Sequence, residues 1–98
     1  MIIHEVVSAL EKAVNPVVKV LQKSEHVKVI VLGFKKGMSL KEHKTNVTTK
    51  LVVIQGSIVY KRDTSSVVLE RYDDIDIPID EPHAVEALDD SICFLIQG

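Results

Sequence analysis

From Val17 to the end of the chain, short runs of β-branched and other apolar residues alternate with turn-forming residues, and this pattern limits the possible folds most. Val and Ile side chains fit the pleated, half-buried surface of a sheet. The apolar parts of successive strands are predicted at 17–21, 27–34, 51–54, 58–60, 67–69, 75–79 and 92–96. Many short, evenly spaced strands without intervening helices predict an all-β sandwich or barrel. For the run 17–21 a helix is an open alternative, since short apolar runs fit either period.

One short helix is expected before the strands. Apolar residues recur at helical spacing over about residues 4–14, which predicts an amphipathic helix that covers the sheet. Asn15-Pro16 should end it, because proline disfavours helical geometry in the preceding residue. The strand at 51–54 is apolar on both faces and should be covered on both sides, by this helix or by a second copy of the chain.

The length of 98 residues predicts a single domain over residues 1–98, with strands over about 17–97. The net charge is −2, the basic residues are scattered and aromatic residues make up 4% of the chain. Nucleic-acid binding would require a basic stripe, usually with aromatic residues for stacking. We therefore expect no nucleic-acid partner.

The first residues lack the basic start and apolar run of a signal peptide. No apolar stretch approaches the roughly 20 residues that span a bilayer. The single cysteine, Cys93, cannot form an internal disulfide and should be a buried, inert thiol. A cytoplasmic protein without a membrane partner is expected.

The segment from Gly37 to Gly56 resembles the first motif of the cupin family. That motif runs G-x5-H-x-H-x3–4-E-x6-G, and Gly37, His43 and Gly56 fall in register with it. The segment that starts at Tyr72 resembles the second motif, G-x5-P-x-G-x2-H-x3-N, with Pro78 and His83 in register. The resemblance covers about residues 27–96 and implies a double-stranded β-helix, a jelly-roll-like barrel.

The chain departs from both motifs at residues that matter for chemistry. Thr45 stands at the position of the second His, and Thr49 at the position of the Glu. Tyr72, Asp80 and Ala87 stand where the second motif has G, G and N. Typical family members hold a metal ion with three His and the Glu. The resemblance therefore leaves only His43 and His83 as metal ligands here.

The period of two along a strand places His43 and Thr45 on one face, and a following strand begins with Thr49. The expected pocket lining is His43, Thr45, Thr49, His83 and, on the next strand, Tyr60. An alternative for the two histidines is a purely structural role, in hydrogen bonds to each other, to the threonines or to water. His4 and His26 are expected at the surface, and Tyr60 is more simply a packed ring than a catalytic acid.

Two imidazoles are fewer ligands than a metal centre ordinarily has. A catalytic zinc keeps three protein ligands, and a non-haem iron triad needs two His and a carboxylate. Glu81 shares the parity of His83 and is the best outside ligand candidate, although it falls in the preceding turn. The expected cofactor is at most a weakly held divalent metal, Zn, Fe, Mn or Ni.

Three functions follow from this sequence, in order of preference. The first is a small cupin-type protein whose pocket binds a small molecule or a weakly held divalent metal, without full metal-dependent catalysis. The second is a metal-dependent enzyme of the dioxygenase or isomerase type with a non-standard ligand set. The third is a structural or interaction module that forms a homodimer, which the resemblance also implies.

Overall fold

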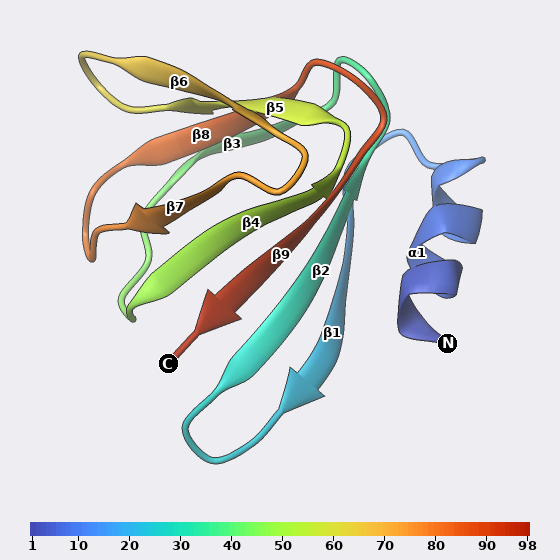
Figure 1. Cartoon of the computed structure of the whole chain (residues 1–98), viewed down its shortest axis with the longest axis horizontal. Helices are drawn as coiled ribbons and strands as arrows, with labels where there is room; N and C mark the ends of the chain where they lie inside the picture. The colour runs from blue at the N-terminus through green and yellow to red at the C-terminus, as the bar shows by residue number, and fades with distance from the viewer.

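The computed structural model describes all residues from Met1 to Gly98, in two antiparallel sheets and one helix (Figure 1). The elements, in chain order, are α1 (Ile2–Leu10), β1 (Val17–Lys23), β2 (Lys28–Phe34), β3 (Ser39–His43), β4 (Thr49–Gln55), β5 (Ser57–Lys61), β6 (Ser66–Glu70), β7 (Asp74–Ile77), β8 (His83–Ala87) and β9 (Ser91–Gln97). The predicted all-β class and the strand at 17–21 are confirmed. No helix is both long and apolar enough to cross a membrane.

The strands form a five-stranded sheet in the order β1-β2-β9-β4-β7 and a four-stranded sheet in the order β3-β8-β5-β6. Most sequential strands cross between the sheets, as the chain does from β4 to β5, whereas β1–β2 and β5–β6 stay within one sheet, and the chain winds as a double-stranded β-helix. This expected topology is confirmed. The two sheets face each other, but strand pairing does not join them into a continuously closed barrel (Figure 1).

The main core lies between the sheets because alternate residues of each strand point inward. On β4 the buried residues are Thr49, Leu51 and Val53, and on β8 they are His83, Val85 and Ala87. The same alternation that buries leucine and valine therefore turns a histidine and a threonine inward. This geometry positions the candidate site.

The helix packs on the outer face of the five-stranded sheet, beside β1 and β2 (Figure 1). Val6 and Leu10 are buried against Val31 and Ile92, so the expected outer cover is confirmed. Contact is close: a Cβ atom on Gly33 would lie 2.5 Å from Val6 Cγ1.

The bounds of two predicted elements differ from the structure. The helix was expected over about 4–14, but it ends at Leu10, where the backbone N–H groups of Lys12 and Ala13 bond to carbonyls three residues back. The strand expected at 75–79 ends at Ile77, and Ile79 is exposed. Pro78 accounts for this end, because proline has no N–H to donate to a neighbouring strand.

The four glycine positions of the two motifs share one backbone conformation. Gly37 and Gly56 have φ of 88° and 83°, and Tyr72 and Asp80 have φ of 76° and 63°. Apart from these four residues, only Gly98 has a positive φ. Residues that carry a Cβ atom rarely adopt this left-handed conformation. The turns of the motif are therefore retained even where its glycines are replaced.

Candidate functional site

A cavity of about 320 Å³ lies between the two sheets, where β3 ends and β8 begins. Seven of its 13 lining residues are hydrophobic; they come from both sheets and include Leu32, Leu51 and Val85. The polar lining residues are His43, Lys44, Thr45, Asn46, His83 and Gln97. An apolar floor with a few polar groups at one side is typical of small-molecule sites.

His43 and His83 are brought together by strand pairing. They are register partners on β3 and β8, and their ring centroids lie 4.2 Å apart at an interplanar angle of 59°. His83 is buried at 3% exposure, whereas the side chain of His43 lies at the exposed mouth. His43 is the last residue of β3, and His83 is the first residue of β8.

Both imidazoles are oriented by backbone carbonyls. His43 Nδ1 lies 2.8 Å from the carbonyl oxygen of Lys41, and His83 Nδ1 lies 3.0 Å from that of Glu81. Because a carbonyl oxygen only accepts hydrogen bonds, each Nδ1 is assigned the proton and each Nε2 keeps a lone pair. Two Nε2 atoms are therefore free to accept a hydrogen bond or bind a cation.

The buried position of His83 also affects its charge. Burial lowers the pKa of His83 below that of a free imidazole; the hydrogen bond to the carbonyl of Glu81 opposes this shift, and the His43 ring adds to it. His83 is therefore neutral at pH 7. In this form it offers an acceptor, not a positive charge, to the cavity.

The two threonines of the motif have different environments. Thr45 follows β3 and lines the cavity, and its buried hydroxyl has no hydrogen-bond partner. The backbone N–H of Asp80 donates to the carbonyl of Thr45 at 2.9 Å and so pins this loop. Thr49 is buried on β4, donates its hydroxyl to the carbonyl of Val47 at 3.0 Å, and does not line the cavity.

Tyr60 lies behind the histidine pair, outside the cavity lining. Its ring centroid is 5.6 Å from that of His83, and the Arg62 guanidinium carbon is 5.2 Å from the centre of the tyrosine ring. The fully buried hydroxyl has no hydrogen-bond partner. Burial raises the pKa of Tyr60, and the Arg62 guanidinium opposes this shift. Tyr60 is thus a neutral, packed side chain of the core.

Glu81, the outside ligand candidate, is paired with another residue. Arg62 Nε lies 2.9 Å from Glu81 Oε1, which is within ion-pair distance. The angle between the two groups does not meet the geometry of a hydrogen bond. The carboxylate does not line the cavity. Sequence reasoning missed this arginine, because only the pairing of β5 with β8 brings residues 62 and 81 together.

Sequence reasoning also missed Lys44, Asn46 and Gln97 as lining residues. Lys44 and Asn46 flank Thr45 in the irregular segment after β3, and every residue from 43 to 47 contributes to the cavity lining. A strict period of two, continued past the end of the strand, places alternate members of this segment away from it. Gln97, at the end of β9, has no local signal.

The donor set does not match the metal centre that the motifs imply. No group of three or more His, Cys, Asp or Glu side chains is placed to hold a metal ion. The positions of the second His and the Glu hold hydroxyls, and one of these is bonded to the backbone. Zinc and non-haem iron sites ordinarily use three protein ligands, so the residues present do not fit such a centre.

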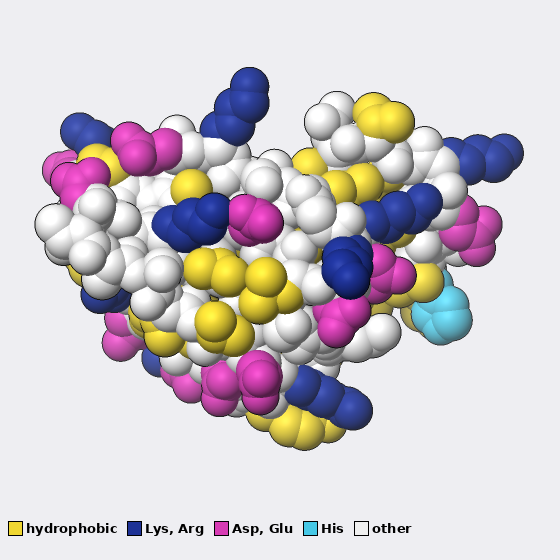
Figure 2. Space-filling view, turned by 90° about the horizontal axis from the view of Figure 1, so that it is seen from above, with side chains coloured by type: hydrophobic (Ala, Val, Ile, Leu, Met, Phe, Trp, Pro, Cys, Tyr) yellow, Lys and Arg dark blue, Asp and Glu magenta, His cyan; other side chains and the backbone are white.

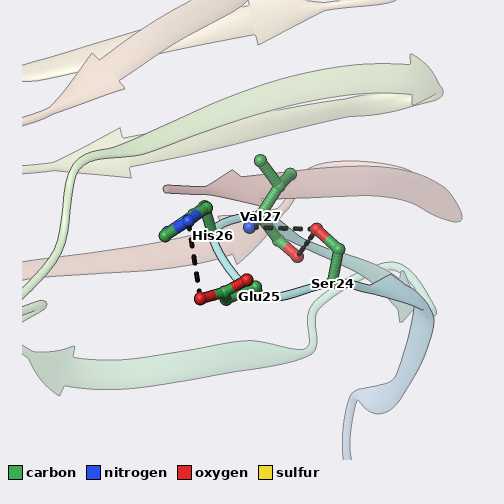
Figure 3. A network of polar contacts seen from close by, with 4 residues as sticks. All are labelled: Ser24, Glu25, His26 and Val27. Carbon is green, nitrogen blue, oxygen red and sulfur yellow. Dashed lines mark hydrogen bonds and ion pairs between the residues drawn. The ribbon is translucent and has the colours of Figure 1, made fainter.

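The other singled-out residues do not line the cavity. His4 and His26 are exposed, as expected. His26 sits in the β1–β2 turn, where its Nε2 lies 3.8 Å from Glu25 Oε1 and the Ser24 hydroxyl bonds to the backbone of Val27 (Figure 3). Cys93 is buried, and burial raises the pKa of its thiol to about 12. Figure 2 shows acidic and basic side chains interspersed over the face seen from above.

Several solved structures have a similar fold. A cupin superfamily protein from Desulfitobacterium hafniense matches with a TM-score of 0.81 at 21% identity, over 88% of this chain and 79% of that chain. An RmlC-like cupin from Desulfovibrio desulfuricans matches with a TM-score of 0.79 at 25% identity, over 89% and 90% of the two chains.

A third match comes from Methanocaldococcus jannaschii. It is an RmlC-like cupin family protein with a double-stranded β-helix fold, with a TM-score of 0.76 at 18% identity over 89% of this chain and 83% of that chain. No protein-family model matches the sequence, and the search of the curated proteins finds no match. These structural matches show that the chain has the cupin fold.

Proposed function

We propose that this protein binds a small organic molecule in the cavity between its sheets, with His43 at the mouth and the buried His83 as the hydrogen-bonding groups. One observation carries the proposal: both Nδ1 atoms are held by backbone carbonyls, so both Nε2 atoms stay free beside an aliphatic floor. A purely structural pair would use its ring nitrogens on each other or on neighbouring side chains. Here the outer nitrogens have no such partner.

The same donor set favours binding over metal-dependent catalysis. Two imidazoles and an unpartnered hydroxyl offer fewer ligands than a dioxygenase or isomerase centre would use. A divalent metal ion with His43 and His83 as its only protein ligands would bind weakly. The cytoplasm as location and the homodimer as assembly stay predictions.

The test uses the full chain without a histidine tag. Bound metals are quantified by mass spectrometry, and the Leu, Ile and Val methyl signals are followed by NMR while small-molecule mixtures are added. We expect well under one metal ion per chain, and shifts confined to methyl groups that line the cavity. The His43→Ala/His83→Ala double variant should bind about tenfold more weakly, an effect of about 1.4 kcal/mol.

The matched control is His4→Ala/His26→Ala, which removes two exposed histidines that do not line the cavity. It should bind like the unmodified chain. Near-stoichiometric Zn, Fe, Mn or Ni, lost only in the cavity variant, would overturn the proposal in favour of a metal-dependent enzyme. A screen in which no molecule moves a lining methyl signal would remove the binding function itself.

A further inference from the structure

The cavity lining contains no negative charge. None of its 13 residues is Asp or Glu, and Lys44 is its only permanently charged member. Lys44 takes part in none of the ion pairs of the structure, and the nearby Glu81 carboxylate is already paired with Arg62. Lys44 is thus the one residue of the lining that carries a full charge, and the sign of that charge favours an anion.

A second, independent observation lies beside the lysine. Thr45 is one of the lining residues, and its hydroxyl is buried without a hydrogen-bond partner. A buried polar group without a partner loses its hydrogen bonds to water, and such groups are rare in native structures. A rotation of the Thr45 side chain would let this hydroxyl donate to an oxygen placed in the cavity, and the neighbouring lining residue Asn46 carries an amide donor.

The remaining surface of the cavity indicates what the uncharged part of the ligand should be. Its floor is aliphatic, with Leu32, Leu51 and Leu95 from the five-stranded sheet and Leu40 and Val85 from the four-stranded sheet. Its volume of about 320 Å³ is at the low end for ligand sites. A single ring or a short chain suits this space.

We propose that the cavity binds a small monoanionic carboxylate with an apolar body, its oxygens at Lys44 and Thr45 and its body on the aliphatic floor. This inference rests on the proposed function and names the ligand class of the same site. The anionic group belongs at Lys44 and Thr45 rather than at the acceptor nitrogens of His43 and His83, which suit a hydrogen-bond donor elsewhere on the ligand. The anionic group lies along the segment after β3, and the apolar group reaches between the sheets. Hydrogen bonds to a charged group contribute about twice as much as neutral ones, so the carboxylate should dominate recognition.

The experiment compares three probes that share one ring and differ in charge: benzoate, benzyl alcohol and benzylammonium. Dissociation constants are measured by methyl NMR titration of the full chain at pH 7.5 and low salt. Benzoate should bind about tenfold more tightly than benzyl alcohol, and benzylammonium should bind more weakly than both. Added salt should weaken benzoate binding alone, because the lysine is at the exposed mouth.

Variants separate the charge from the fold. Lys44→Gln should reduce benzoate affinity about tenfold, to the level of benzyl alcohol, and Lys44→Arg should keep it. Lys41→Gln is the matched control, because Lys41 is exposed and three residues away, and its side chain does not line the cavity. Thr45→Val should weaken benzoate binding and leave benzyl alcohol binding unchanged.

The outcomes distinguish this inference from the function on which it rests. Equal binding of benzoate and benzyl alcohol, unaffected by Lys44→Gln, would overturn the ligand class and leave a small-molecule pocket. Preferential binding of benzylammonium would do the same. If none of the three probes moves a lining methyl signal, while other small molecules of the screen do, the carboxylate is excluded. If nothing in the screen binds, the pocket function fails as well.

Discussion

The two faces of the five-stranded sheet are packed in opposite ways. On the outer face, Val31 is fully buried under Val6 and Leu10 of the helix, and even a methyl group on Gly33 would overlap Val6. On the inner face, the next residue, Leu32, lines a cavity of about 320 Å³. Protein interiors are ordinarily packed to the density of organic crystals, so the cavity is the exception that needs a reason.

The difference shows on which face of the sheet the packing is less stabilising. The outer contact is dry and aliphatic, which is what stability alone favours. The inner one keeps a hollow and a buried hydroxyl without a partner, both of which destabilise a fold. Departures from consistent packing are expected at functional sites. Three predictions test this contrast, beginning with the largest effect.

The outer face should be the more sensitive to loss of side-chain volume. Leu10→Ala removes a buried side chain from the contact between helix and sheet and should lower the free energy of unfolding by about 2–4 kcal/mol. Leu40→Ala, in the cavity lining, should cost about 1 kcal/mol, because that side chain already borders open space. Urea unfolding followed by circular dichroism measures both. Equal losses would contradict the contrast.

The two motif threonines should respond with opposite signs to the same isosteric change. Thr49→Val breaks the hydrogen bond to the carbonyl of Val47 and should cost about 1–2 kcal/mol. Thr45→Val removes a hydroxyl that has no partner, so stability should stay unchanged or rise by up to about 1 kcal/mol. Each variant is the other's control in one set of urea titrations. A loss on Thr45→Val as large as on Thr49→Val would mean that the hydroxyl is already satisfied.

The smallest effect is a pH dependence from His83. Its pKa is lowered by burial, so the unfolded chain binds more protons than the folded chain once the pH falls below about 6.5. This contribution to stability is present above that pH and is lost as the pH falls through the folded pKa. His83→Gln should therefore flatten the decline of unfolding free energy between pH 7.5 and pH 5.5.

The control for this titration is His26→Gln, in the exposed β1–β2 turn. It should leave the pH profile unchanged. A profile in which His83→Gln and His26→Gln coincide would show that His83 is not selectively neutral in the folded state.

Much of the fold could be predicted because strand formation has a local signature. The alternation of Leu51 and Val53 with their neighbours states which side chains face inward, and the structure buries both. The end of the helix was less predictable. Leu10 is the last fully helical residue that the sheet buries, and Ala13, which continues the apolar pattern and packs against the same cluster, lies after the helix has ended.

The candidate site was only partly predictable. The motif spacing identified His43 and His83, but their pairing across β3 and β8, and the carbonyls that orient them, come from strand register. The threonines looked equivalent in sequence and differ in the structure, because only one of them finds a backbone partner. Lys44 lies in an irregular segment to which no periodicity applies.

Residue type and the period of two along a strand are local properties of a sequence. They were enough to predict the fold class, the inward faces of the strands and the loss of two metal-ligand positions. Tertiary structure decided that residues 43 and 83 meet, that Tyr72 and Asp80 keep the backbone of the motif's glycines, and that a lysine without an ion pair lines the cavity. These features depend on contacts between distant segments. No short-range pattern encodes such contacts, because each is set by the register and crossing of whole strands.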